Sequence, residues 1–335
     1  MLFQPTIIAL LLASGLAVLM LISVAPFAIQ VIRHWDIRSG SERQLVLERR
    51  TYLFSTLLTF VFGLQLLALL LFVFNADRLS SMFVGAMCAV GTLNVNTYGF
   101  PSLLVQMGIF FLAAMWLVIN HVDTLAPDYP LVKIKYALLL ALLPLLGLSF
   151  WLEFQYFSGL QANVITSCCG SLFSGESKTL VSEASALPPL AAIILFYGSM
   201  LVVLGIGSLH CLGATRVTAY ALAGASALAF GMAMMAVLSF ISLYIYEHPH
   251  HHCPFCILKP EYGYRGYALY LPLFLATAAG LGVGAIQPFA NRSSLSAIIP
   301  AVSQRLSKLA VVSFAAFLLV ATFFVLNSNL ILLEH

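Results

Sequence analysis

The sequence predicts an all-α integral membrane protein, a polytopic bundle of about eight transmembrane helices in a single domain over residues 1–335. Of its 335 residues, 61% are hydrophobic and only 8% are charged. Because a soluble domain carries about 25% charged residues, this chain cannot cover a water-facing surface of ordinary size. Its apolar residues also form long runs, and each run can cross a hydrocarbon core of about 30 Å as a helix. The runs lack the alternation of a barrel strand, so helices are expected.

Eight apolar runs are the expected spans: 7–32, 52–75, 101–120, 136–154, 188–209, 218–246, 267–287 and 309–331. No basic residue precedes the first run, so it lacks the start of a cleaved signal peptide and is expected to remain as a span. The segment 82–100 is also partly apolar, but its uninterrupted part is short and Asn94 and Asn96 follow. We expect it to be a re-entrant or surface-lying segment.

The basic residues predict how these spans are oriented. The loop 33–51 holds five arginines, and loops rich in Lys and Arg stay in the cytoplasm. Alternation from this loop places eleven basic residues inside and four outside. Lys133 and Lys135 are counted among those in cytoplasmic loops. The expected location is therefore a bacterial inner membrane, with both termini outside and with outer loops at 155–187 and 247–266.

Five of the six cysteines fall on the predicted outer side. They are Cys88, Cys168, Cys169, Cys253 and Cys256, whereas Cys211 ends the fifth span on the cytoplasmic side. Disulfides form and persist at the outer face of a bacterial inner membrane. We therefore expect any disulfide chemistry of this protein to involve the two outer loops.

The stretch HPHHHCPFC in the second outer loop contains a Cys-X-X-Cys pair, Cys253 and Cys256. Two sulfurs at this spacing can close a small ring, and a stabilised thiolate can attack a disulfide at neutral pH. Pro254 stiffens the pair and removes a backbone donor. If the preceding histidines were protonated, they would lower the pKa of the Cys253 thiol. The pattern is typical of an exposed pair with a low pKa.

A first hypothesis is a membrane thiol–disulfide oxidoreductase or electron-transfer subunit. Cys253 would attack, Cys256 would resolve, and Cys168 with Cys169 would form the second pair. Electrons would pass to or from a membrane quinone or a periplasmic protein with a thioredoxin-like domain. In outline, the two motifs resemble the membrane disulfide-generating enzymes of the DsbB and vitamin K epoxide reductase groups. The resemblance covers these two short motifs and implies a similar mechanism.

Two other hypotheses stay open. Imidazoles and thiolates suit zinc and copper, so a metal site could be built from the loop's histidines and cysteines. The histidines concerned are His248, His250, His251 and His252. Alternatively, a permanent disulfide could cross-link the outer loops of a non-catalytic subunit in a larger membrane complex.

Two outer stretches rich in Asn and Tyr could form a pocket beside the cysteines. The residues concerned are Asn94, Asn96, Tyr98, Tyr262 and Tyr264. They could hold a quinone headgroup or dock a partner. An interfacial aromatic belt explains the same composition.

The sequence excludes several other chemistries. Ile257 follows Cys256, so the motif for covalent c-type haem attachment is absent. There is no Walker A pattern, and nucleic acid is not an expected partner; lipid and other membrane subunits are. Glu153 is expected to be an interfacial carboxylate that faces water, and with so few charges inside the spans ion-driven transport is not favoured.

Overall fold

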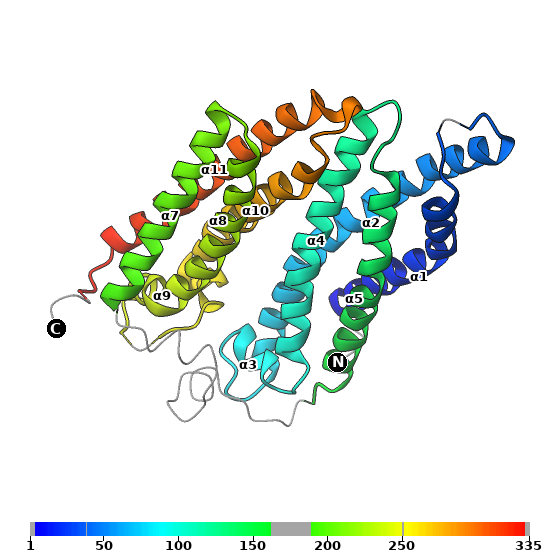
Figure 1. The fold of residues 1–335 in the computed structure, drawn as a ribbon. Coiled ribbons are helices and arrows are strands. Elements are labelled where there is room, and N and C mark those ends of the chain that lie inside the picture. The colour runs from blue at the N-terminus through cyan, green and yellow to red at the C-terminus, as the bar shows by residue number, and fades with distance from the viewer. Residues whose placement is uncertain (1–3, 38, 162–188, 250, 332–335) are drawn as a thin grey trace. The chain divides into compact units, whose positions relative to one another are not determined.

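The computed structural model describes residues 4–37, 39–161, 189–249 and 251–331, and within these ranges the chain is helical with no strand (Figure 1). Eight of the described helical segments are long and apolar enough to cross a membrane. Five of them are single helices: α1 Pro5–His34, α4 Gly99–Leu125, α5 Val132–Ser158, α7 Pro189–Leu212 and α11 Ile298–Leu326. Two more continue into a 3-10 turn: α2 Glu42–Leu79 into Ser80–Met82, and α10 Arg265–Ile286 into Gln287–Phe289. The eighth, Arg216–Tyr246, joins α8 Arg216–Ala236 to α9 Ser242–Tyr246 through a π-helical turn, Val237–Ile241.

The number of long apolar helices confirms the prediction, but two ends differ from it. Helix α2 begins at Glu42, so the connection that follows α1 is shorter than the predicted loop 33–51. Helix α11 begins at Ile298, well before the predicted residue 309. Arg305 and Lys308 interrupt the apolar run, yet Val302, Ser303 and Ser307 keep a buried face through this part of the helix. Helical periodicity continues where the apolar run does not.

Residues 82–100 do not form another long helix. The 3-10 turn Ser80–Met82 is followed by a loop and by α3, Ala89–Leu93, whose five residues are all buried. The other 3-10 turns are Cys256–Leu258, Pro260–Tyr262, Gln287–Phe289 and Ser293–Leu295. The expectation that 82–100 is not a ninth span is confirmed in that α3 is far too short to cross a bilayer.

The chain divides into two compact units. Unit 1 comprises Met1–Ala76, Val95–Ala162 and Pro288–Pro300, and unit 2 comprises Asp77–Asn94, Asn163–Gln287 and Ala301–His335. Within unit 1, α5 packs against both α1 and α4. The core there includes Phe62, Trp116 and Tyr136, all fully buried.

A buried ion pair connects α4 and α5 in unit 1. The Nζ of Lys135 lies 2.8 Å from Oδ2 of Asp123 and donates a hydrogen bond to Oδ1 of Asn120 at 3.0 Å. Asp123 also accepts from the backbone N–H of Leu131, which fixes the turn between the helices. The prediction that Lys135 lies in a loop is wrong, since it lies on α5 and its side chain is 1% exposed. A buried cation is tolerated here because a carboxylate neutralises it.

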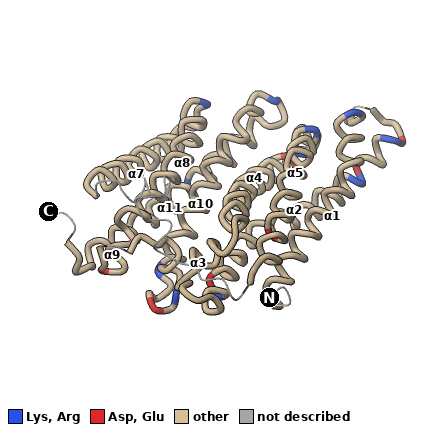
Figure 2. Tube along the Cα trace, turned by 90° about the horizontal axis from the view of Figure 1, so that it is seen from below, with Lys and Arg blue, Asp and Glu red and all other residues tan. Residues whose placement is uncertain are grey.

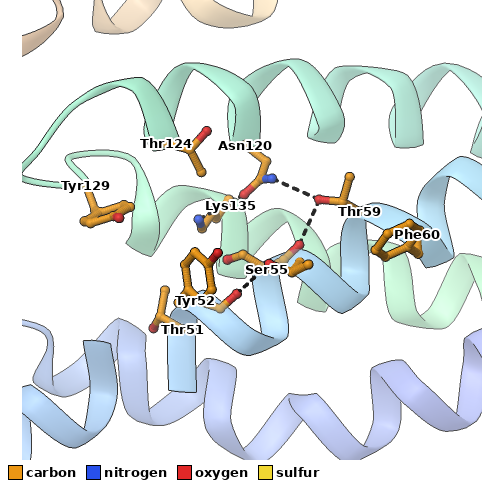
Figure 3. A pocket seen from close by; sticks show the side chains of 10 residues that line it. Thr51, Tyr52, Ser55, Thr59, Phe60, Asn120, Thr124, Tyr129 and Lys135 are labelled. Carbon is orange, nitrogen blue, oxygen red and sulfur yellow. Dashed lines mark hydrogen bonds between the residues drawn. The ribbon is translucent and has the colours of Figure 1, made fainter. Parts of the chain in front are cut away.

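A cavity of about 270 Å³ opens beside this pair (Figure 3). Its wall combines hydroxyl-bearing side chains of α2, such as Ser55 and Thr59, with Asn120 and Lys135. Asn120 donates to the Oγ1 of Thr59 at 3.1 Å and so connects α4 to α2.

In unit 2, α8 packs closely against both α7 and α10. A Cβ at Gly280 would lie 2.0 Å from the Oγ of Ser226, and one at Gly284 would lie 2.5 Å from the Cβ of Ala223. These two glycines therefore let α10 approach α8 more closely than any other residue would. Most charged residues in each unit lie toward helix ends and connections (Figure 2).

Candidate functional site

Three cysteine sulfurs of unit 2 meet in one place, which we call the sulfur cluster: Cys88, Cys253 and Cys256. The Sγ of Cys88 lies 3.2 Å from the Sγ of Cys253, and all three sulfurs lie within 4.8 Å of one another. Cys88 and Cys253 are 0% exposed and Cys256 is 4% exposed. No disulfide joins these three residues, because a bonded pair would be about 2.05 Å apart.

Three short elements bring the sulfurs together. Cys88 is the extended residue immediately before α3, and Cys256 opens the 3-10 turn Cys256–Leu258. Cys253 lies between α9 and that turn. Two tyrosine hydroxyls hold the backbone at this point: Tyr246 of α9 donates to the carbonyl of Cys253, and Tyr270 of α10 donates to the carbonyl of Pro254. The loop is thus fixed to the helices on both sides of it.

Gly266, near the start of α10, allows the turn that carries Cys256 to pack tightly. A Cβ at Gly266 would lie 2.8 Å from Cδ2 of Leu258, 2.9 Å from Cγ1 of Ile257 and 3.1 Å from the backbone carbon of Ile257. Two of these distances are shorter than real Cβ contacts, so a larger residue here would force the side chains of Leu258 and Ile257 to move and would press on the backbone of Ile257. The sulfur cluster therefore depends on a residue that bears no side chain.

His252 attaches the loop to the π-helical turn. Its Nδ1 lies 2.8 Å from the carbonyl oxygen of Leu238, a residue of that turn. Because a carbonyl has no hydrogen to donate, Nδ1 carries the proton, and in the neutral ring the lone pair is on Nε2. Single π-helical turns inside α-helices are frequent at functional sites. This one lies next to the sulfur cluster's loop.

His251 stacks on the ring of Tyr246, with 4.1 Å between the ring centroids. Burial lowers the pKa of His251, and the neighbouring His248 and His252 lower it further. The hydrogen bond with Cys256 and burial raise the pKa of the Cys253 thiol, although the contact with Cys88 and a hydrogen bond from the backbone of Phe255 oppose this. The expectation of an exposed Cys253 with a low pKa is therefore wrong. The sequence showed nearby basic residues, but neither the hydrogen bond of Cys253 with Cys256 nor the burial of the thiol could be read from it.

The other predicted metal ligands do not join the cluster among the described residues. Cys88, Cys253 and Cys256 form the one group of three close Cys, His, Asp or Glu ligands found in the described ranges. His248 is exposed. Cys168, Cys169 and His250 lie outside the described residues.

The five predicted pocket residues are divided between the units. In unit 1, Asn96 donates to the carbonyl of Tyr156 and accepts from the backbone of Tyr98, whose ring lies edge-on to Trp151. In unit 2, Asn94 directly follows α3, and Tyr264 is 55% exposed with a positive φ of 55°. Tyr262 is the one of the five that packs edge-on to Tyr246, beside the cluster.

No sequence pattern pairs Cys88 with another cysteine. The residue lies 165 positions from Cys253, so no local spacing links them. A usable signal was present in the apolar segment with small residues around Cys88, which suits a short buried turn better than an exposed loop.

Comparison of the chain with protein-family models, with curated proteins and with solved structures finds no match.

Proposed function

We propose that this protein is a membrane thiol–disulfide oxidoreductase whose working centre is the sulfur cluster. The observation that carries the proposal is the 3.2 Å contact between the sulfurs of Cys88 and Cys253, with Cys256 close to both. Cys253 thus has two possible disulfide partners. Three sulfurs in this arrangement are the minimum for passing a disulfide within one site.

The exchange step involves no net oxidation. From a Cys253–Cys256 disulfide, the Cys88 thiolate attacks the sulfur of Cys253. A Cys88–Cys253 bond forms, the Cys253–Cys256 bond breaks, and Cys256 leaves as a thiolate that takes up a proton. Geometry makes Cys253 the central sulfur of this step. The initial assignment of Cys253 as the attacking thiol is thereby replaced by a role as the sulfur under attack.

Net turnover needs an external electron carrier. Oxidation of two thiols to a disulfide releases two electrons and two protons, which a quinone accepts to become a quinol. The second external partner would be a periplasmic protein with a thioredoxin-like domain, which would exchange a disulfide with this protein. Burial of the three sulfurs means that such a partner would need an intermediary thiol, and Cys168 with Cys169 is the proposed second pair.

The proposed location is the outer face of a bacterial inner membrane, with both termini outside. The distribution of basic residues supports this orientation, and the short buried α3 supports a re-entrant or surface segment at 82–100. Contact with lipid follows from the eight apolar helices, and further membrane subunits are possible partners.

A second candidate is a thiolate-bound zinc or copper ion. The observation that favours it is the mutual distance of the sulfurs, all within 4.8 Å in a buried site. With metal–sulfur bonds of about 2.3 Å, thiolates around one ion lie roughly 4 Å apart. The backbone hydrogen bond from Phe255 to the Cys253 sulfur is also a contact that stabilises a thiolate.

One experiment on the purified full chain separates these candidates. The protein is equilibrated in thiol–disulfide buffers of graded potential, alkylated with two isotopic reagents in succession and read by mass spectrometry, with elemental analysis of the same sample. The oxidoreductase predicts potential-dependent pairing of Cys253. Stoichiometric zinc or copper with all three thiols protected selects the metal site, and one fixed disulfide at every potential selects the cross-linked non-catalytic subunit.

A further inference from the structure

A carboxyl group lies buried in unit 1, where three helices meet. Glu153 of α5 is 1% exposed, so the expectation that it faces water at the interface is wrong. Its Oε2 lies 2.6 Å from the hydroxyl of Ser14 on α1. Its Oε1 accepts from the amide of Gln106 on α4 at 2.9 Å and from the hydroxyl of Ser149 at 3.2 Å.

No cation within the described part of the chain pairs with this carboxyl. The one ion pair formed by described residues joins Lys135 to Asp123, and Lys135 lies eighteen residues back along α5, about 27 Å at 1.5 Å per residue. The helices that pack around Glu153 have no charged residue over Pro5–Gln30, Thr51–Asn75 or Gly99–Asn120. The titratable residue nearest to Glu153 in sequence is Tyr156, one turn later on α5, and a phenol carries no positive charge. An isolated charge in such surroundings is costly.

The two contacts of the Ser14 hydroxyl favour the neutral form of the carboxyl. A serine hydroxyl has a single hydrogen to donate. The Ser14 Oγ lies 2.9 Å from the carbonyl oxygen of Leu10, which can only accept, and 2.6 Å from Oε2 of Glu153. If Ser14 donates to Leu10, the shorter contact requires a hydrogen on Glu153. A neutral Glu153 satisfies both contacts, because Glu153 then donates to Ser14 and Ser14 donates to the carbonyl of Leu10.

Unsatisfied oxygens lie on the same helices. Gln106 is 6% exposed, and its Oε1 has no hydrogen-bond partner within the described chain, although its amide nitrogen contacts Glu153. One helical turn earlier on α4, the fully buried hydroxyl of Ser102 also has no partner there. Buried polar atoms of this kind are commonly hydrogen-bonded by an internal water.

We propose that Glu153 is a proton-binding site inside unit 1, which takes up and releases a proton at Oε2. The ligand is the proton, and unit 1 is thereby equipped for a proton-coupled step across the membrane. Membrane proteins use buried carboxyls of this kind as proton relays. The inference does not depend on the proposed thiol chemistry, which involves other residues of unit 2. A sodium ion could use the same oxygens, and the experiment distinguishes the two.

Infrared spectroscopy of the full chain in lipid nanodiscs tests the proposal first. The wild type should show the carbonyl band of a protonated carboxylic acid that is lost in Glu153→Gln and that disappears reversibly at alkaline pH. Glu153→Gln keeps a donor toward Ser14 and should fold normally. Absence of a difference band between the two proteins overturns the proposal. A band that persists at every pH at which the protein stays folded overturns it as well.

Labelling with dicyclohexylcarbodiimide identifies the ligand. The reagent adds to protonated carboxyls in apolar surroundings, and mass spectrometry locates the adduct. We expect modification of Glu153 that decreases as pH rises and that is unchanged when sodium replaces potassium. Asp123, which is equally buried but paired with Lys135, is the internal control and should remain unmodified. Protection by sodium at constant pH would replace the proton with a sodium ion.

Discussion

The sulfur of Cys88 lies 3.2 Å from the sulfur of Cys253, although the two residues are 165 positions apart in the chain. The contact depends on α3 on one side and on the loop held by Tyr246 and Tyr270 on the other. Cys256 completes the group, so Cys253 has one neighbour from its own motif and one from a distant segment. The proposed disulfide exchange requires that Cys253 have both of these neighbours.

Cys88→Ser should remove one of the two partners of Cys253. We expect the Cys253–Cys256 disulfide to remain and the cross-linked product between residues 88 and 253 to vanish from peptide maps. The matched control is Cys211→Ser in the same unit, since Cys211 contacts the hydroxyl of Ser307 and lies outside the sulfur cluster. An identical change in both variants would mean that the serine acts through stability and not through exchange.

Gly266→Ala should disturb the sulfur cluster without altering any sulfur. The added Cβ meets Ile257 and Leu258 at 3.1 Å or less, and such overpacking typically costs about 1–3 kcal/mol. We expect a lower midpoint of thermal unfolding and faster alkylation of Cys256. Gly231→Ala, where a Cβ meets nothing within 4 Å, is the control and should be neutral or slightly stabilising. Equal stability of the two variants would argue against the tight packing.

Gly280→Ala tests the packing of α8 against α10. Its Cβ would lie 2.0 Å from the Oγ and 2.7 Å from the Cβ of Ser226, so the helices would have to separate. We expect a loss of folding stability larger than that of Gly224→Ala, where no atom lies within 4 Å. Unfolding by a denaturing detergent measures the difference. The double variant Gly280→Ala with Ser226→Gly should recover part of the loss.

Lys135→Met should destabilise unit 1 strongly. Removal of one partner from a buried ion pair leaves an uncompensated charge and typically costs about 3–5 kcal/mol. Asp123→Asn should have a similar effect for the same reason. The pair of changes Lys135→Met with Asp123→Leu leaves no buried charge and should be more stable than either single variant. Additive losses in the double variant would show that the two charges do not interact.

His252→Ala should loosen the loop that carries Cys253. It removes the hydrogen bond to the carbonyl of Leu238 in the π-helical turn, and we expect faster hydrogen exchange over 247–258 and faster alkylation of Cys253. His248→Ala is the control because His248 is exposed. Unchanged exchange in His252→Ala would show that the contact does not hold the loop.

The membrane-spanning architecture could be predicted because long apolar runs translate directly into helices. Where helices carry charges near their ends, the boundaries could not be predicted: Arg305 and Lys308 lie within α11, and Lys135 is buried on α5 because Asp123 of α4 neutralises it. The burial of Glu153 could not be predicted for a similar reason, because two of its three polar contacts come from other helices.

The candidate site could be predicted in part. Cys253 and Cys256 stood out by their spacing, and the structure places both in the sulfur cluster. Cys88 could not be assigned, because its contact depends on tertiary packing. The histidines suggested cations or ligands, but stacking of His251 on Tyr246 and the bond from His252 to Leu238 give them roles in holding the loop.

The central claim is that Cys253 exchanges disulfide partners within the sulfur cluster. Differential alkylation of the full chain across a series of thiol–disulfide buffers, followed by peptide mapping, measures this directly. The account predicts that the fraction of Cys253 held in a disulfide changes reversibly with potential. Among the oxidised molecules, Cys253 is linked to Cys256 in some and to Cys88 in others, at a ratio that does not depend on potential. If Cys88, Cys253 and Cys256 all remain thiols at every potential, or Cys253 keeps a single partner throughout, the account is contradicted.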